Sequence, residues 1–136
     1  MPDGPLVLVI DDDAEIVRGL RIRLGAAGYQ VLTAGDGERG LTTAIEDRPD
    51  AILLDIRMPG MDGLAVLAEL RNHAETRSIP VVVMSANVVE QTRQKALALG
   101  ARYFVAKPYP PQTLMAALSS AMTEPSPVGG ECRVGR

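Results

Sequence analysis

The stretch Leu6-Val7-Leu8-Val9-Ile10-Asp11-Asp12-Asp13 is a run of five apolar residues followed directly by three acidic residues. Continuous apolar runs of this length are typical of short strands that are buried on both faces of a parallel sheet. The same pattern recurs in three later apolar runs, which end at Asp55, Ser85 and Lys107. The chain therefore predicts a buried sheet whose strands end in polar residues.

Segments with helical spacing of apolar residues separate these runs, so strands and helices alternate along the chain. The expected strands are Leu6–Ile10, Gln30–Thr33, Ala51–Leu54, Ile79–Met84 and Tyr103–Ala106, and the expected helices are 16–27, Glu38–Arg48, 64–71, Val89–Leu99 and Gln112–Met122. Alternation of this kind predicts an α/β protein with helices on both faces of a parallel sheet. Since crossovers are right-handed, we expect the flavodoxin-like, doubly wound (βα)5 sandwich with strand order 2-1-3-4-5.

In that strand order, ligands bind where the first and third strands lie side by side at the carboxyl edge of the sheet. Asp11 and Asp12 follow the first strand, and Asp55 follows the third. Two carboxylates ~4 Å apart repel by about 4 kcal/mol at an effective dielectric constant of 20, so a cation or protonation is expected there. Mg²⁺ suits oxygen ligands of this kind. For Asp13 alone, the preferred interpretation is the N-cap of the following helix.

Asp55 is also the candidate nucleophile, because carboxylates accept phosphoryl groups as aspartyl phosphates. The segment Met58–Gly63 behind it contains Pro59, Gly60 and Gly63, which suit a sharp turn that aims main-chain carbonyls inward. Taken alone, Asp55 at a strand end is as readily explained as a helix cap. The acidic residues expected beside it at the end of the first strand favour the role of nucleophile over that of a helix cap.

Ser85 and Lys107 supply a hydroxyl and an ammonium at the same predicted edge. A hydroxyl can donate to a phosphoryl oxygen, and lysine is a compact cation suited to phosphate. Lys107 directly precedes Pro108, and a tight turn at a strand end is a typical place for a cis X-Pro bond. Taken alone, Ser85 is more simply explained as a helix cap and Lys107 as a surface lysine. The prediction of a phosphoryl site therefore depends on finding both together with Asp11, Asp12 and Asp55.

Composition narrows the range of functions. The 136 residues carry a net charge of -3 without a basic cluster, which disfavours direct contact with nucleic acid. No apolar run approaches the roughly 20 residues of a membrane-spanning helix, and the N-terminus lacks the pattern of a signal peptide. The single cysteine, Cys132, cannot form an internal disulfide. We therefore expect a cytoplasmic protein that contacts neither membrane nor nucleic acid.

The C-terminal stretch 124–136 is rich in proline and glycine and has little to bury. It predicts a disordered tail or the start of a linker. Residues 1–123 are then one domain, which is long enough to bury a core.

Four fragments in order resemble the receiver domain of two-component response regulators. They are Val9-Ile10-Asp11-Asp12, the segment Leu53–Gly63, Val83-Met84-Ser85-Ala86 and Lys107-Pro108, and the resemblance covers about residues 5–122. It implies that Asp55 takes a phosphoryl group from the phosphohistidine of a sensor histidine kinase or a histidine phosphotransfer domain. It also implies Mg²⁺ as the cofactor.

The resemblance implies a role for each matching residue. Asp12 would bind Mg²⁺ directly, Asp11 largely through water, and Asp55 and the main-chain carbonyl of Arg57 would complete the protein ligands. Ser85 would hydrogen-bond the phosphoryl group and Lys107 would pair with it. Phe104 stands at the position of the switch aromatic, where tyrosine is common, and it has no hydroxyl.

The implied function is a phosphorylation switch. Movement of Ser85 and Phe104 would reshape the face formed by the helix Val89–Leu99, the strand Tyr103–Ala106 and the helix Gln112–Met122, and a downstream protein partner would bind that face. Such a domain assists its own phosphorylation and dephosphorylation, and we do not expect a conventional enzyme.

Two other interpretations compete with the switch. A phosphatase similar to the haloacid dehalogenase group would place its nucleophile in an Asp-x-Asp pattern, which Asp11–Asp13 permits. A receiver-like module that no longer switches is the other. The segment behind Asp55 argues against the first, and the intact set of acidic residues, Ser85 and Lys107 argues against the second.

Overall fold

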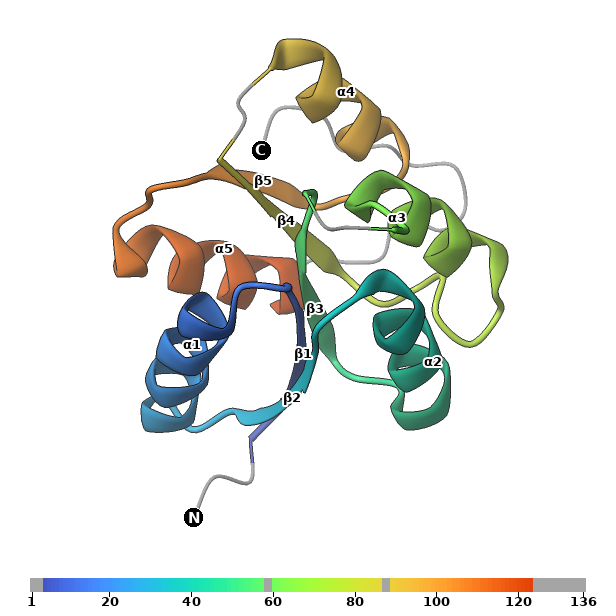
Figure 1. The fold of residues 1–136 in the computed structure, drawn as a ribbon. Coiled ribbons are helices and arrows are strands. Elements are labelled where there is room, and N and C mark those ends of the chain that lie inside the picture. The colour runs from blue at the N-terminus through green and yellow to red at the C-terminus, as the bar shows by residue number, and fades with distance from the viewer. Residues whose placement is uncertain (1–3, 58–59, 87–88, 124–136) are drawn as a thin grey trace.

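The computed structural model describes residues 4–57, 60–86 and 89–123. Met58, Pro59 and the predicted tail 124–136 lie outside the described residues. Strands and helices alternate throughout, as Figure 1 shows. The elements are β1 (Leu6–Ile10), α1 (Ala14–Ala26), β2 (Gln30–Ala34), α2 (Gly37–Asp47), β3 (Ala51–Asp55), α3 (Gly63–Asn72), β4 (Val81–Ser85), α4 (Glu90–Ala98), β5 (Tyr103–Ala106) and α5 (Pro111–Thr123).

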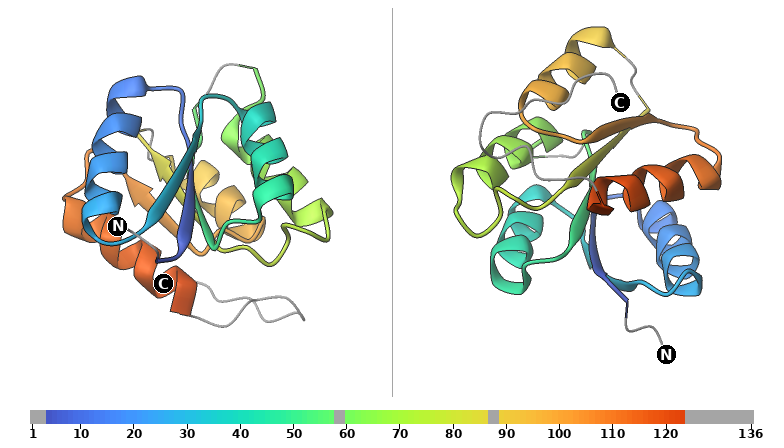
Figure 2. Two further views of the ribbon diagram at one scale, coloured as in Figure 1. Left: turned by 90° about the horizontal axis from the view of Figure 1, so that it is seen from below. Right: turned by 180° about the vertical axis from the view of Figure 1, so that it is seen from behind.

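The five strands form one parallel sheet in the order β2-β1-β3-β4-β5, which confirms the predicted fold. Helices α1 and α5 cover one face, and α2, α3 and α4 cover the other (Figures 1 and 2). The two faces have separate cores because successive strand residues point to opposite sides. Leu8 and Ile10 of β1 pack in the core beneath α2, α3 and α4, whereas Val7 and Val9 pack in the core beneath α1 and α5.

Burial on both faces explains why the strand sequences are continuously apolar. All five residues of β3 and all five of β4 are buried. These two strands also carry their polar residues inside the sheet, since Asp55 is the last residue of β3 and pairs with Met84 of β4. Their carboxyl ends are therefore held by the sheet itself and not by a loop.

Several boundaries differ from the prediction by one or two residues. β4 begins at Val81 instead of Ile79, because Pro80 has no N–H to donate to a strand ladder. β3 and β4 each run one residue further, so that they include Asp55 and Ser85. Helix α2 ends at Asp47, and Arg48 takes a left-handed conformation with φ 46°. Arg48 precedes Pro49, which disfavours the helical conformation at that residue.

Candidate phosphorylation and metal site

The carboxyl ends of β1 and β3 bring three acidic residues together. Carboxylate oxygens of Asp11, Asp12 and Asp55 all lie within 4.8 Å of one another. Asp11 and Asp55 are buried, with 1% and 5% of their surface exposed, whereas Asp12 is exposed. The cluster therefore combines two carboxylates held within the protein with one that faces solvent.

Lys107 directly follows β5, the strand at one edge of the sheet, and its side chain reaches this cluster. Its Nζ atom lies 3.3 Å from Asp11 Oδ2 and 3.5 Å from Asp55 Oδ1, so one ammonium bridges the two buried carboxylates. The amide N–H of Lys107 donates to the carbonyl of Ser85 across 2.8 Å, which ties the end of β5 to the end of β4. The Lys107–Pro108 peptide bond is cis, in a turn of the kind where the sequence made a cis bond plausible.

Asp13 is directed away from the cluster. Its carboxylate accepts hydrogen bonds from the amides of Glu15 at 3.0 Å and Ile16 at 3.3 Å, which confirms the predicted N-cap of α1. The amide of Asp13 in turn donates to Asp11 Oδ1 at 2.9 Å. Of the three consecutive acids, Asp11 and Asp12 therefore belong to the site, and Asp13 caps the helix that leaves it.

The charges of the site do not balance among the described residues. Burial raises the pKa of Asp55, and the negative charge of Asp11 raises it further. Lys107 and the amide of Arg57, which lies 3.4 Å from Asp55 Oδ1, oppose this rise without cancelling it. Three carboxylates thus face one ammonium, and their oxygen atoms are the ligands that Mg²⁺ prefers. The residues present fit a divalent cation.

The raised pKa of Asp55 makes a prediction about stability. A folded-state pKa above the unfolded value means that ionisation of Asp55 destabilises the metal-free fold as the pH rises through the folded-state pKa. Asp55→Asn keeps the shape of the carboxyl and removes the charge, so thermal denaturation in EDTA at pH 7 should show a higher Tm for the variant. The difference in Tm should disappear once the pH falls below 3.8, the ordinary pKa of an aspartate carboxyl group. A lower Tm for the variant at pH 7 would contradict the assigned direction.

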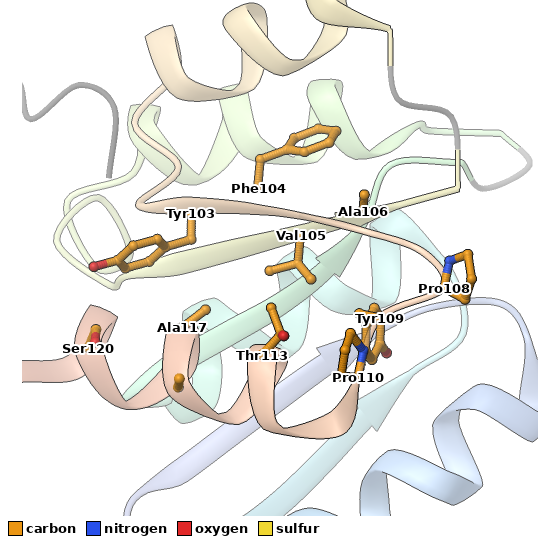
Figure 3. Close-up of a pocket in the computed structure, with 11 residues that line it drawn as sticks. Tyr103, Phe104, Val105, Ala106, Pro108, Tyr109, Pro110, Thr113, Ala117 and Ser120 are labelled. Atoms are coloured by element: carbon orange, nitrogen blue, oxygen red, sulfur yellow. The ribbon is translucent and has the colours of Figure 1, made fainter.

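Ser85 and Phe104 lie where the sequence placed them. Ser85 is fully buried at the end of β4, next to Ala106 of β5. Phe104 is half-buried and packs against the core beneath α2, α3 and α4, whereas its neighbour Tyr103 packs on the opposite side of the strand. Figure 3 shows the two rings on opposite sides of β5. Tyr103 and Phe104 therefore point to opposite faces of the sheet, as neighbouring residues of a strand do.

Tyr109 borders the site and was not anticipated from the sequence. Its pKa is raised by burial and then by the negative charges of Asp11 and Asp55. The hydroxyl donates to Met84 Sδ across 3.7 Å. The ring also lines an open groove of about 470 Å³ between β5 and α5, together with residues such as Tyr103, Pro108 and Thr113 (Figure 3). The sequence feature that could have indicated this role is the position of Tyr109, two residues after Lys107 and directly after Pro108.

Comparison with known proteins identifies the family. The family model of the response regulator receiver domain matches residues 7–119, and the chain belongs to this family. The transcriptional regulatory protein KdpE of Mycobacterium tuberculosis is 42% identical over 117 residues, which are 86% of this chain and 50% of KdpE. The chain thus spans about half the length of this relative. The family match favours the receiver interpretation over the one based on the haloacid dehalogenase group.

Solved structures agree with this assignment. A putative response regulator from Chloroflexus aurantiacus superposes with a TM-score of 0.85 at 29% identity, covering 90% of this chain and all of that one. The receiver domain of the sensor histidine kinase PA1611 from Pseudomonas aeruginosa superposes with a TM-score of 0.82 at 28% identity, covering 89% and 99% of the two chains. That structure has a magnesium ion coordinated in its active-site cleft.

Among the described residues here, no helix has the length and apolar content needed to cross a membrane.

Proposed function

We propose that this chain is a phosphorylation switch in which Asp55 accepts a phosphoryl group from a phosphohistidine of a sensor kinase or phosphotransfer domain. The observation that carries the proposal is the cluster of Asp11, Asp12 and Asp55, in which the ammonium of Lys107 bridges Asp11 and Asp55. Mg²⁺ would be held by these three carboxylates and the main-chain carbonyl of Arg57, and when bound it would offset the charge of the transferring phosphoryl oxygens. The magnesium site of the PA1611 receiver domain supports this choice of ion.

The transfer exchanges one bond to phosphorus for another. An oxygen of the Asp55 carboxylate attacks phosphorus while the bond from phosphorus to the partner's imidazole nitrogen breaks, and the electron pair stays on that nitrogen. The imidazole, protonated at its other nitrogen, leaves as a neutral histidine. Lys107 would pair with the incoming phosphoryl oxygens, because its ammonium already lies 3.5 Å from Asp55 Oδ1. The protein contributes positioning and charge stabilisation, and we do not class it as a conventional enzyme.

Phosphorylation would alter the face formed by α4, β5 and α5. Ser85 would be drawn to the phosphoryl group, and Phe104 would rotate inward behind it. Helix α4 is suited to move: within its nine fully described residues Ala96 is the one buried side chain, and the N-cap Val89 makes no side-chain hydrogen bond. A helix held by so little burial needs little free energy to shift.

The output of this domain would then be a protein contact. The net charge of -3 and the lack of a basic cluster in the sequence favour a protein partner on the α4-β5-α5 face over direct binding of nucleic acid. KdpE is a transcriptional regulatory protein, and this chain matches only about half of it, so the function of the whole relative does not conflict with a protein contact here. We place the switch in the cytoplasm, where sensor kinases present their phosphohistidine.

An NMR titration with beryllofluoride and Mg²⁺ tests the switch, because beryllofluoride imitates the aspartyl phosphate. We expect amide shifts at Asp55 and Lys107 and also along the face from Val89 to Leu118. Ser85→Ala should weaken the distant shifts more than those in the pocket, since it removes the hydroxyl that links the two. Shifts confined to the pocket would identify a receiver-like module that binds the ligand without switching.

A further inference from the structure

The segment between Asp55 and α3 is closed tightly at its base. The amide of Gly63 donates to the carbonyl of Ile56 across 2.8 Å. A Cβ atom at Gly63 would lie 2.5 Å from both the carbonyl oxygen of Asp55 and the Cα of Ile56, so only glycine fits there. Asp62 then caps α3 by accepting from the amide of Ala65 at 2.9 Å. These contacts fix the two ends of the segment but leave its outer side to another element.

Met61, the residue before that cap, lies against the first residue of α2. Gly37 is buried, and a Cβ atom added to it would lie 2.8 Å from the carbonyl oxygen and 3.1 Å from the Cβ of Met61. It would also lie 2.7 Å from Cγ2 of Val66 in α3. A side-chain methyl such as that of Val66 can rotate or be deleted, whereas the Met61 carbonyl belongs to the main chain of the segment. A residue larger than glycine at position 37 would therefore press on the main chain of Met61, behind Asp55.

We infer that Gly37 is a positioning residue for the metal site, acting through the Met61 backbone. The same short segment carries Arg57, whose amide lies 3.4 Å from Asp55 Oδ1 and whose carbonyl is the proposed ligand. A shift at Met61 would reach Arg57 through described residues, because Gly63, two residues after Met61, donates to the carbonyl of Ile56, the residue before Arg57. This inference rests on the proposed function, since it assumes that the Arg57 carbonyl binds the ion.

Helix α2 offers a matched control for the effect of crowding. A Cβ atom at Gly40, three residues later and equally buried, would lie 2.6 Å to 2.9 Å from Cδ1, Cγ1 and Cγ2 of Ile10. All of these contacts are with a side chain in the core, and none is with the segment behind Asp55. Gly40→Ala should therefore cost stability through overpacking against the Ile10 side chain, as Gly37→Ala does against Val66, but it should leave the Met61 backbone in place.

The experiment measures Mg²⁺ affinity and thermal stability of the full chain by calorimetry for the wild type, Gly37→Ala and Gly40→Ala. We expect both variants to lose Tm, but only Gly37→Ala to bind Mg²⁺ more weakly, by roughly tenfold, the scale seen when a residue supporting a ligand is lost. In metal-free protein, the Arg57 amide resonance should also shift in Gly37→Ala and stay in place in Gly40→Ala. Equal Mg²⁺ affinities in Gly37→Ala and the wild type would overturn the inference, and so would equal weakening in both variants.

A double variant covers the case in which Gly37→Ala does not fold. Gly37→Ala/Val66→Ala removes the collision with the Val66 methyl and leaves the collision with the Met61 carbonyl. It should bind Mg²⁺ about tenfold more weakly than Val66→Ala alone, again on the scale of a lost supporting residue. Equal binding by these two proteins would refute the role of Gly37. Failure of the wild type to bind Mg²⁺ would instead refute the proposed function, so the two failures are distinguishable.

Discussion

Asp55→Asn is expected to abolish phosphoryl labelling of this protein. An amide oxygen is a poor nucleophile, and it cannot form the acyl phosphate that a carboxylate forms. Asp55 is the one member of the cluster that ends β3, and it lies within reach of both Lys107 and the Asp11–Asp12 pair. Incubation with acetyl phosphate and Mg²⁺, followed by measurement of intact mass, should show one added phosphoryl group on the wild type and none on the variant.

The control for this experiment is Asp13→Asn, which removes the same charge from a neighbouring acid. Asparagine is as good an N-cap as aspartate, so α1 should remain intact and labelling should persist. Full labelling of Asp55→Asn would move the phosphorylation site to another residue. Loss of labelling in both variants would show that net charge, and not the nucleophile, controls the reaction.

The fold could be predicted because the sequence repeats one local rule. The three central strands are short apolar runs buried on both faces, and each of these runs ends in a polar residue. Once the strand order is limited by right-handed crossovers, the ends of β1 and β3 must lie side by side. That step alone brings Asp11, Asp12 and Asp55 together, and the structure places their oxygens within 4.8 Å. The ends of the elements were predicted less well than the elements themselves. Pro80 cannot donate a hydrogen bond to the sheet, so β4 begins after it, and Pro49 disfavours the helical conformation of the residue before it, so α2 ends at Asp47.

The rest of the site could not be predicted because it depends on contacts between elements. Hydrophobic periodicity says which face of a helix is buried but not which backbone it meets. Nothing in the pattern around Gly37 indicates that Met61 packs against it, since a glycine adds no apolar signal. Likewise, the bridge from Lys107 to both buried carboxylates depends on the path of the chain after β5. The separation of Asp13, which caps α1, from Asp12, which belongs to the cluster, was by contrast expected from the sequence, because an aspartate before a helix is a typical N-cap.

This difference between Asp12 and Asp13 leads to the second large effect. Asp12→Asn should weaken Mg²⁺ binding by more than roughly tenfold, since it replaces an anionic ligand of a hard cation with a neutral one. The carboxylate of Asp12 is exposed and has oxygens within 4.8 Å of those of Asp11 and Asp55, so it can reach an ion without moving the sheet. Calorimetric titration with Mg²⁺ measures the change directly.

Asp13→Asn serves again as the matched variant, because it changes the net charge by the same amount at the next residue. Its carboxylate is already occupied by the amides of Glu15 and Ile16, so Mg²⁺ affinity should change by less than about threefold through screened, longer-range charge alone. The contrast between the two variants therefore separates a direct ligand from the general field of the acidic cluster. If Asp13→Asn weakened binding more than Asp12→Asn, the ion would be held by the helix cap, and the assignment of the cluster would be wrong by one residue.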